Sequence, residues 1–263
     1  MPSPLGAALR RERLITALAL AVLSVLAWLW LLRGAGMDMA PHVALDPFPH
    51  RTPAMAMPPP SWDLAGFLLV ASMWWVMMVA MMLPAAAPVI LLNAAAAPRE
   101  GPYAQVRSGW FLAGYLAVWA VVSVAAATLQ LALEWSGALD QMTLGSDARW
   151  FSAAVLLTAG LYQLSPLKGA CLSQCRNPAQ FLSRNYRPGR EGAFAMGVKH
   201  GAFCVGCCWL LMALLFVGGV MNLAWIALLT LLVAAEKLLP GGRWIALSAG
   251  VLCIAWGAAT AFA

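Results

Sequence analysis

The chain has 263 residues, of which 63% are hydrophobic and only 10% are charged. Soluble domains carry about 25% charged residues, and a soluble fold has too little polar surface to cover so many apolar side chains. The composition therefore excludes a soluble enzyme, a disordered protein and a nucleic-acid-binding protein, although the formal net charge is +6. Its long continuous apolar runs also exclude a membrane β-barrel, whose strands alternate apolar and polar residues. The prediction is an all-α, polytopic transmembrane helical bundle.

A helix that crosses a membrane needs about 20 mostly apolar residues. The chain offers about seven such runs, with six as the alternative count, and they cover residues 14–32, 64–92, 109–133, 150–167, 193–220, 223–239 and 243–263. The first run is longer than the apolar region of a signal peptide, which has about 7–15 residues, and we interpret it as a retained signal anchor. Residues 1–63 then form this anchor and an outer Met-, His- and Pro-rich loop, and residues 64–263 form a metal-binding transmembrane bundle.

Lysine and arginine are concentrated in alternate connecting segments. Arg10, Arg11 and Arg13 precede the first run, and the richest segment, residues 168–190, follows the fourth. Basic residues collect on the cytoplasmic side of membrane proteins. The N-terminus is therefore predicted to be cytoplasmic, and the lipid bilayer is the first expected partner.

Five of the six cysteines form two groups with helical spacing. Cys171 and Cys175 are four residues apart, and His200, Cys204, Cys207 and Cys208 share one face of a later helix. Buried cysteine is often only a small apolar side chain, which is our interpretation of Cys253. A disulfide is disfavoured on the reducing cytoplasmic side. A zinc site is the less favoured metal alternative, because thiolates and thioethers together favour Cu(I).

Methionines form two further groups. The second hydrophobic run carries five of them in two adjacent helical rows, and the outer loop adds four more with a histidine: Met73, Met77, Met78, Met81 and Met82, then Met37, Met39, Met55, Met57 and His42. Thioethers bind soft ions without losing a proton and remain ligands where thiols would oxidise. The alternatives are a flexible packing surface and an extended proline-rich loop. Read with the thiols, these residues predict a Cu(I) ion.

Two charged residues are predicted to support this metal site from outside it. Glu236 would pair with Lys199 or orient the imidazole of His200, because metal-binding histidines commonly donate their second N–H to a carboxylate. The alternative is that the charges near residue 237 only anchor helix ends at the membrane interface.

Several segments resemble a bacterial family of predicted metal-binding integral membrane proteins. They cover residues 77–84, 166–175, 199–209, 219–225 and the Glu236-Lys237 pair. This family otherwise carries a domain-of-unknown-function label, and its members are sometimes labelled copper chaperones. The resemblance extends from Ser61 to Arg243. It implies a multi-pass protein of the bacterial inner membrane.

The leading hypothesis is Cu(I) handling by ligand exchange among Cys, Met and His, as a copper chaperone or delivery protein for cuproenzyme assembly. A cuproenzyme or a periplasmic copper carrier would be the protein partner. The alternatives are a membrane thiol–disulfide oxidoreductase, a metal transporter, and an assembly factor that binds no metal. Because we find no hydrolase triad, phosphate loop or cofactor fingerprint, no enzymatic activity is predicted.

Overall fold

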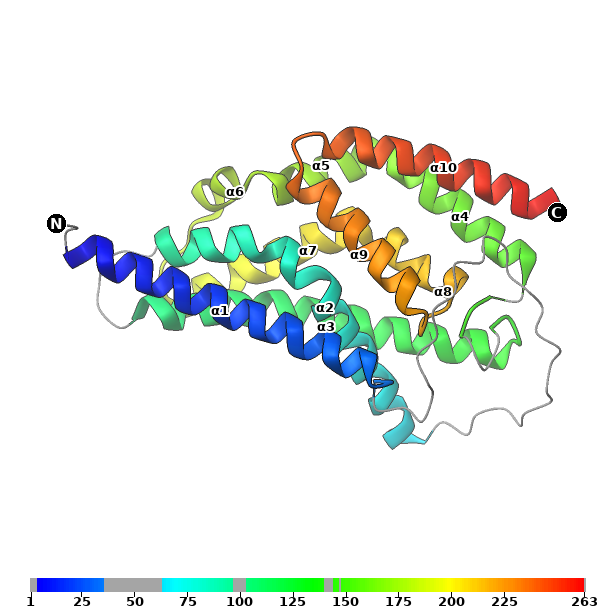
Figure 1. Cartoon of the computed structure of the whole chain (residues 1–263), viewed down its shortest axis with the longest axis horizontal. Helices are drawn as coiled ribbons and strands as arrows, with labels where there is room; N and C mark the ends of the chain where they lie inside the picture. The colour runs from blue at the N-terminus through cyan, green and yellow to red at the C-terminus, as the bar shows by residue number, and fades with distance from the viewer. Residues whose placement is uncertain (1–3, 36–62, 97–102, 140–143, 147, 263) are drawn as a thin grey trace.

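The structure, a computed structural model, describes residues 4–35, 63–96, 103–139, 144–146 and 148–262. Within these ranges the chain is helical, as predicted, and the helices are α1 (Pro4–Leu32), α2 (Leu64–Ala96), α3 (Tyr103–Trp135), α4 (Arg149–Leu164), α5 (Pro166–Arg176), α6 (Pro178–Asn185), α7 (Gly189–Ala213), α8 (Leu215–Gly218), α9 (Leu223–Leu238) and α10 (Gly242–Phe262). Figure 1 shows these helices gathered into one elongated bundle.

Five helices of the described chain are long and apolar enough to cross a membrane: Arg13–Leu32, Leu64–Ala95, Arg107–Trp135, Gly189–Gly218 and Gly242–Phe262. The other two expected spans correspond to α4 and α9, which have 16 residues each. At about 1.5 Å per residue such a helix is about 24 Å long, less than the roughly 30 Å hydrocarbon core. The predicted fourth run was too long because Pro166 forces Ser165 into an extended conformation and starts a new helix.

Glycines allow α3 and α7 to pack backbone against backbone. A Cβ added at Gly114 would lie 2.2 Å from the carbonyl oxygen of Phe194, and one added at Gly197 would lie 2.0 Å from that of Phe111. Small residues are characteristic of close helix contacts in membranes. This close approach fixes which side chains of α7 face the interior.

The second helix, α2, lies against α1, α3 and α9. It contains Pro84 and Pro88, which cannot donate the helical hydrogen bond and therefore kink a helix. Figure 1 shows that α2 changes direction along its length. Trp74 of this helix is buried and donates from Nε1 to Gln130 Oε1 at 2.7 Å. The methionines of α2 are also buried in the protein interior.

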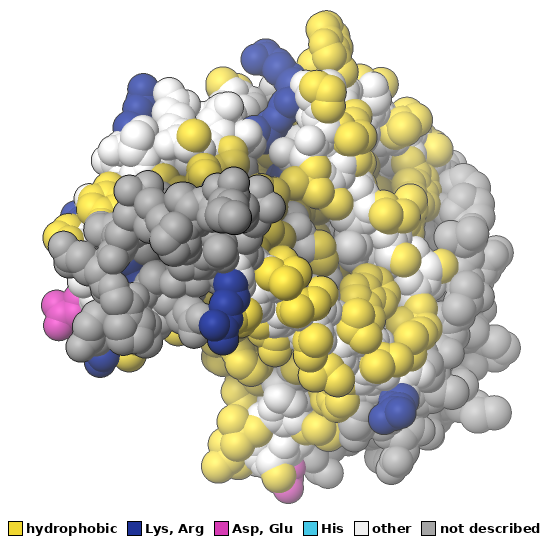
Figure 2. All heavy atoms as spheres, turned by 60° about the vertical axis from the view of Figure 1, so that its left-hand side comes forward, with side chains coloured by type: hydrophobic (Ala, Val, Ile, Leu, Met, Phe, Trp, Pro, Cys, Tyr) yellow, Lys and Arg dark blue, Asp and Glu magenta, His cyan; other side chains and the backbone are white. Residues whose placement is uncertain are grey.

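The outer surface of the bundle is strongly apolar. Val121, Leu231 and Leu252 are 72%, 68% and 69% exposed. Figure 2 shows one face on which hydrophobic side chains dominate the described surface and charged ones are few. Exposed apolar side chains of this kind are suited to contact with lipid.

The arginine-rich connection between α4 and α7 is fastened to the bundle. Arg107 on α3 donates to Tyr186 Oη at 2.7 Å and to the carbonyl of Arg187 at 3.1 Å. Arg176 at the end of α5 donates to the carbonyls of Leu239 and Pro240. These bonds hold the segment that follows α6 against α3, and the end of α5 against the end of α9.

Candidate metal centre

Three sulfur atoms from two helices converge in the interior. Cys204 and Cys208 are one turn apart on α7 and therefore share a face. The Cys208 thiol lies 3.7 Å from Met82 Sδ of α2, and the Cys204 and Cys208 thiols lie close enough to interact. All three residues are at most 1% exposed. We call these three residues the sulfur cluster.

A lysine and a tyrosine complete the surroundings of the sulfur cluster. Lys237 Nζ lies 3.0 Å from Cys204 Sγ and 4.0 Å from Met82 Sδ. Tyr115 Oη lies 3.2 Å from the same cysteine sulfur and donates to the carbonyl of Met82 at 3.3 Å. An ammonium group beside a thiol stabilises negative charge on sulfur. The cluster can therefore hold a thiolate, the form that binds metal.

The other cysteines of the two predicted groups lie next to this cluster. The structure packs α5 on α7, and the thiols of Cys175 and Cys207 lie close enough to interact. Cys171 is half-buried, and its sulfur packs against Gly206, where an added Cβ would lie 2.8 Å away. The structure thus brings the two groups together, while Cys253 is placed on α10.

His200 lies on α7 one turn before Cys204, inside a cage of aromatic rings. Its ring centroid lies 5.0 Å from that of Phe181, 5.9 Å from Tyr115 and 6.0 Å from Phe111. Its Nδ1 has no hydrogen-bond partner among the described residues. Among all the residues that the structure describes, no three His, Cys, Asp or Glu side chains are arranged as a ready set of metal ligands. A metal at this place would therefore depend on the thioether of Met82 as well as on thiols.

The methionine rows of α2 are buried but are not equivalent. Met73, Met77, Met78 and Met81 are at most 1% exposed, like Met82, but only Met82 has a sulfur contact with the thiols among the contacts described above. The remaining predicted ligands, Met37, Met39, His42, Met55 and Met57, lie outside the described residues.

The structure corrects the predicted role of Glu236. Its carboxylate accepts from Lys168 Nζ at 2.6 Å and from Gln163 Nε2 at 2.8 Å, and this ion pair is buried, with Lys168 1% and Glu236 2% exposed. Lys199 is instead exposed and donates to Asn185 Oδ1. The prediction that Glu236 pairs with Lys199 is therefore wrong. The Lys199 side chain is exposed, whereas the Lys168 side chain extends from α5 into the interior of the bundle and reaches Glu236 there.

Sequence patterns do not single out Tyr115, which lies at the sulfur cluster, or Lys168, which is the buried partner of Glu236. Tyr115 lies in a helix with many apolar aromatic residues and shows no distinguishing spacing. Lys168 belongs to a group that we interpreted as basic residues of a cytoplasmic loop, although its position three residues before Cys171 offered one indication. Lys237, which we considered a membrane anchor, is in fact only 6% exposed.

The fold and the sulfur cluster together describe a helical membrane bundle with a buried site of soft ligands. Residues 71–260 match a family model described as copper chaperone. The chain belongs to this copper chaperone family, as the resemblance in its motifs had indicated. No curated protein and no solved structure matches the chain.

Proposed function

We propose that the protein binds Cu(I) at the sulfur cluster and passes it to a recipient by ligand exchange, as a chaperone in the assembly of a copper enzyme. The observation that carries this proposal is the meeting of Cys204, Cys208 and Met82 from two helices in the interior. Thiolate and thioether ligands select soft ions, among which Cu(I) accepts this mixture. Copper is the cargo in this proposal, and no catalytic turnover is required.

The arrangement favours Cu(I) over zinc. Structural zinc is almost always held by four Cys or His ligands in a closed tetrahedron, and the described residues do not provide such a set. The inner ligand set would be Cys204, Cys208 and Met82, with Cys207 and Cys175 as the adjacent thiols that receive or supply the ion. We further propose that the methionines of α2 and the outer loop extend this chain of soft ligands, and that the membrane is the bacterial inner membrane.

The test is a Cu(I) titration of the purified full-length protein in detergent, under anaerobic reducing conditions, against a chromogenic Cu(I) chelator. Wild-type protein should withdraw one copper from the chelator, and the Cys204→Ser/Cys208→Ser variant should not. Cys253→Ser is the matched control, because that thiol is also buried but lies on α10. Equal copper binding by the double variant and the wild type would refute the proposed site.

A second candidate function has one observation in its favour. The interacting thiols of Cys175 and Cys207 come from different helices, as in a pair that could form and break a disulfide. A membrane thiol–disulfide oxidoreductase would therefore use these two residues. Trapping of free thiols after mild oxidation separates the two functions: only the second requires a Cys175–Cys207 disulfide in working protein.

A further inference from the structure

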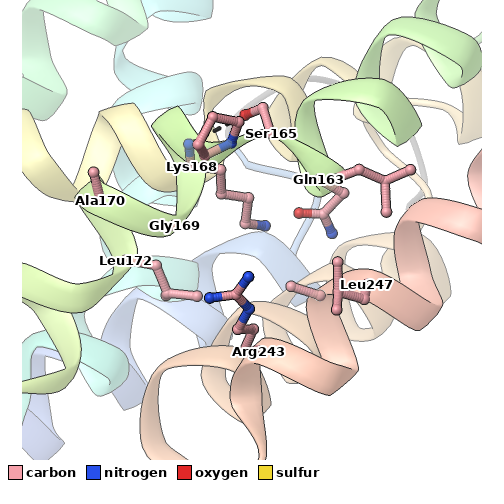
Figure 3. Close-up of a pocket in the computed structure, with 11 residues that line it drawn as sticks. Gln163, Ser165, Lys168, Gly169, Ala170, Leu172, Arg243 and Leu247 are labelled. Atoms are coloured by element: carbon pink, nitrogen blue, oxygen red, sulfur yellow. Dashed lines mark hydrogen bonds between the residues drawn. The ribbon is translucent and has the colours of Figure 1, made fainter.

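A cavity of about 320 Å³ lies where α4, α5 and α10 meet, and no residue of the sulfur cluster lines it. Figure 3 shows the side chains of Gln163, Lys168 and Arg243 directed toward a common space between these helices. Ligand pockets in proteins begin at about 300 Å³, so the cavity is large enough for a small polar group. The proposed copper site uses none of these three residues.

The cavity carries an excess of positive charge. Lys168 is neutralised by Glu236 at 2.6 Å, whereas Arg243 forms no ion pair with the residues that the structure describes. The cavity also lies at the first turns of α5 and α10, which begin at Pro166 and Gly242. Helix N-termini carry partial positive charge and favour anions. The cavity is therefore suited to a ligand with one negative charge.

An unpaired acceptor on a residue that lines the cavity adds a second requirement. Gln163 is 4% exposed, and its Nε2 donates to Glu236 Oε1 at 2.8 Å. This bond fixes the orientation of the amide and leaves Oε1 without a hydrogen-bond partner in the described chain. A buried acceptor without a partner costs about 1–3 kcal/mol. A ligand that brings a hydroxyl or another N–H or O–H donor would remove this cost.

One wall of the cavity is apolar and faces outward. Leu164 and Leu247 line it, and Leu164 is 41% exposed. Next to them, Leu161 on α4 and Val251 on α10 are 61% and 59% exposed. A ligand whose polar end occupies the cavity could therefore continue as hydrocarbon along the lipid-facing sides of α4 and α10.

We propose that this cavity binds the headgroup of an anionic phospholipid that carries hydroxyl donors, the chemistry of phosphatidylglycerol. The phosphate pairs with Arg243 at the start of α10, a headgroup hydroxyl donates to Gln163 Oε1, and the acyl chains lie along α4 and α10. One negative charge on the lipid matches the single unpaired positive charge of the cavity. The inference does not depend on the proposed copper function.

The test is thermal unfolding of the delipidated full-length protein in a neutral detergent, with phosphatidylglycerol, phosphatidylcholine or free glycerophosphoglycerol added in separate titrations. Binding to the native state raises the melting temperature, and saturation of one site should give a shift of about 5 °C or more. We expect this shift with phosphatidylglycerol and at most a small one with phosphatidylcholine, which has the phosphate but lacks the donors and the net charge.

The variant Arg243→Gln should lose most of the phosphatidylglycerol shift. Arg149→Gln is the matched control. This substitution removes the same charge, and Arg149 is exposed at the opposite end of α4. Equal shifts in both variants, or equal shifts with phosphatidylcholine, would overturn the proposal. An equal shift with glycerophosphoglycerol would overturn the lipid assignment and indicate a soluble phosphate ester. Because Arg243 is exposed and no other described side chain depends on it for an ion pair, the variant should fold.

Discussion

Lys237 Nζ of α9 lies 3.0 Å from Cys204 Sγ of α7 in the buried interior of the bundle. A charged group in such surroundings is costly unless it is paired. Each of the two groups therefore supports the charged form of the other. Among the described residues, Lys237 is the one charged side chain in contact with the sulfur cluster, and Cys204 is the thiol that it contacts.

Replacing Lys237 by Met should weaken Cu(I) binding at neutral pH about tenfold, which corresponds to about 1.4 kcal/mol. The reason is that the Cys204 thiolate loses the adjacent positive charge. Chelator competition measures the affinity. Lys199→Met is the control, because Lys199 is exposed and contacts Asn185 instead. Tighter binding by Lys237→Met would show that the ammonium competes with copper for the sulfur atoms.

The substitution Glu236→Gln should destabilise the fold without changing copper affinity. It leaves Lys168 buried without a carboxylate, and breaking a buried ion pair costs about 3–5 kcal/mol. Denaturant unfolding in detergent measures the loss. The double variant Lys168→Met/Glu236→Leu should recover much of the stability, since apolar residues often replace a buried pair at little cost. A fall in copper affinity at unchanged stability would instead assign Glu236 to the metal site.

The close packing of α3 and α7 should not tolerate a methyl group at Gly197. A Cβ there would lie 2.0 Å from the carbonyl oxygen of Phe111, and overpacking typically costs about 1–3 kcal/mol. Gly109→Ala on α3 is the control, because an added Cβ meets nothing within 4 Å and alanine is the better helix former. Gly197→Ala should thus lower the melting temperature while Gly109→Ala leaves it equal or higher.

Cys171 should be the cysteine that small alkylating reagents reach first. It is half-buried, whereas the other five cysteines are buried. Partial burial raises the pKa of the Cys171 thiol, so less of it is thiolate at neutral pH than in an exposed cysteine. Its alkylation, followed by peptide mass spectrometry, should be slow at pH 7 and accelerate up to and beyond pH 9. Faster alkylation of Cys204 under native conditions would contradict the packing of the sulfur cluster.

Helical spacing was enough to predict that Cys204 and Cys208 share one face of a helix and that the α2 methionines form adjacent rows. It could not single out Met82 from its neighbours, because the part of α2 that meets the cysteines of α7 is decided by the packing of the whole bundle. It also could not pair Lys168 with Glu236, which are separated by 68 residues. Such contacts depend on the tertiary arrangement, and periodicity describes only one helix at a time.

A pattern that describes one helix at a time also explains why the sequence predicts about seven spans, whereas five helices of the described chain are long and apolar enough to cross a membrane. Hydrophobicity continues from residue 150 to 167 and predicts one helix, but the Ser165-Pro166 step ends α4 and starts α5. The sequence shows that Pro166 can interrupt a helix. It does not show that α5 then packs on α7 and brings Cys175 close to Cys207.

The near-complete burial of the sulfur cluster has a kinetic consequence. Met82, Cys204 and Cys208 are at most 1% exposed, so no acceptor in solution can touch an ion held there. Release must wait until α2 and α7 separate locally, and its rate is then set by that opening. Above a modest acceptor concentration the rate of copper loss should reach a plateau, and a partner that docks on the bundle and opens it would accelerate the transfer without binding the metal more tightly.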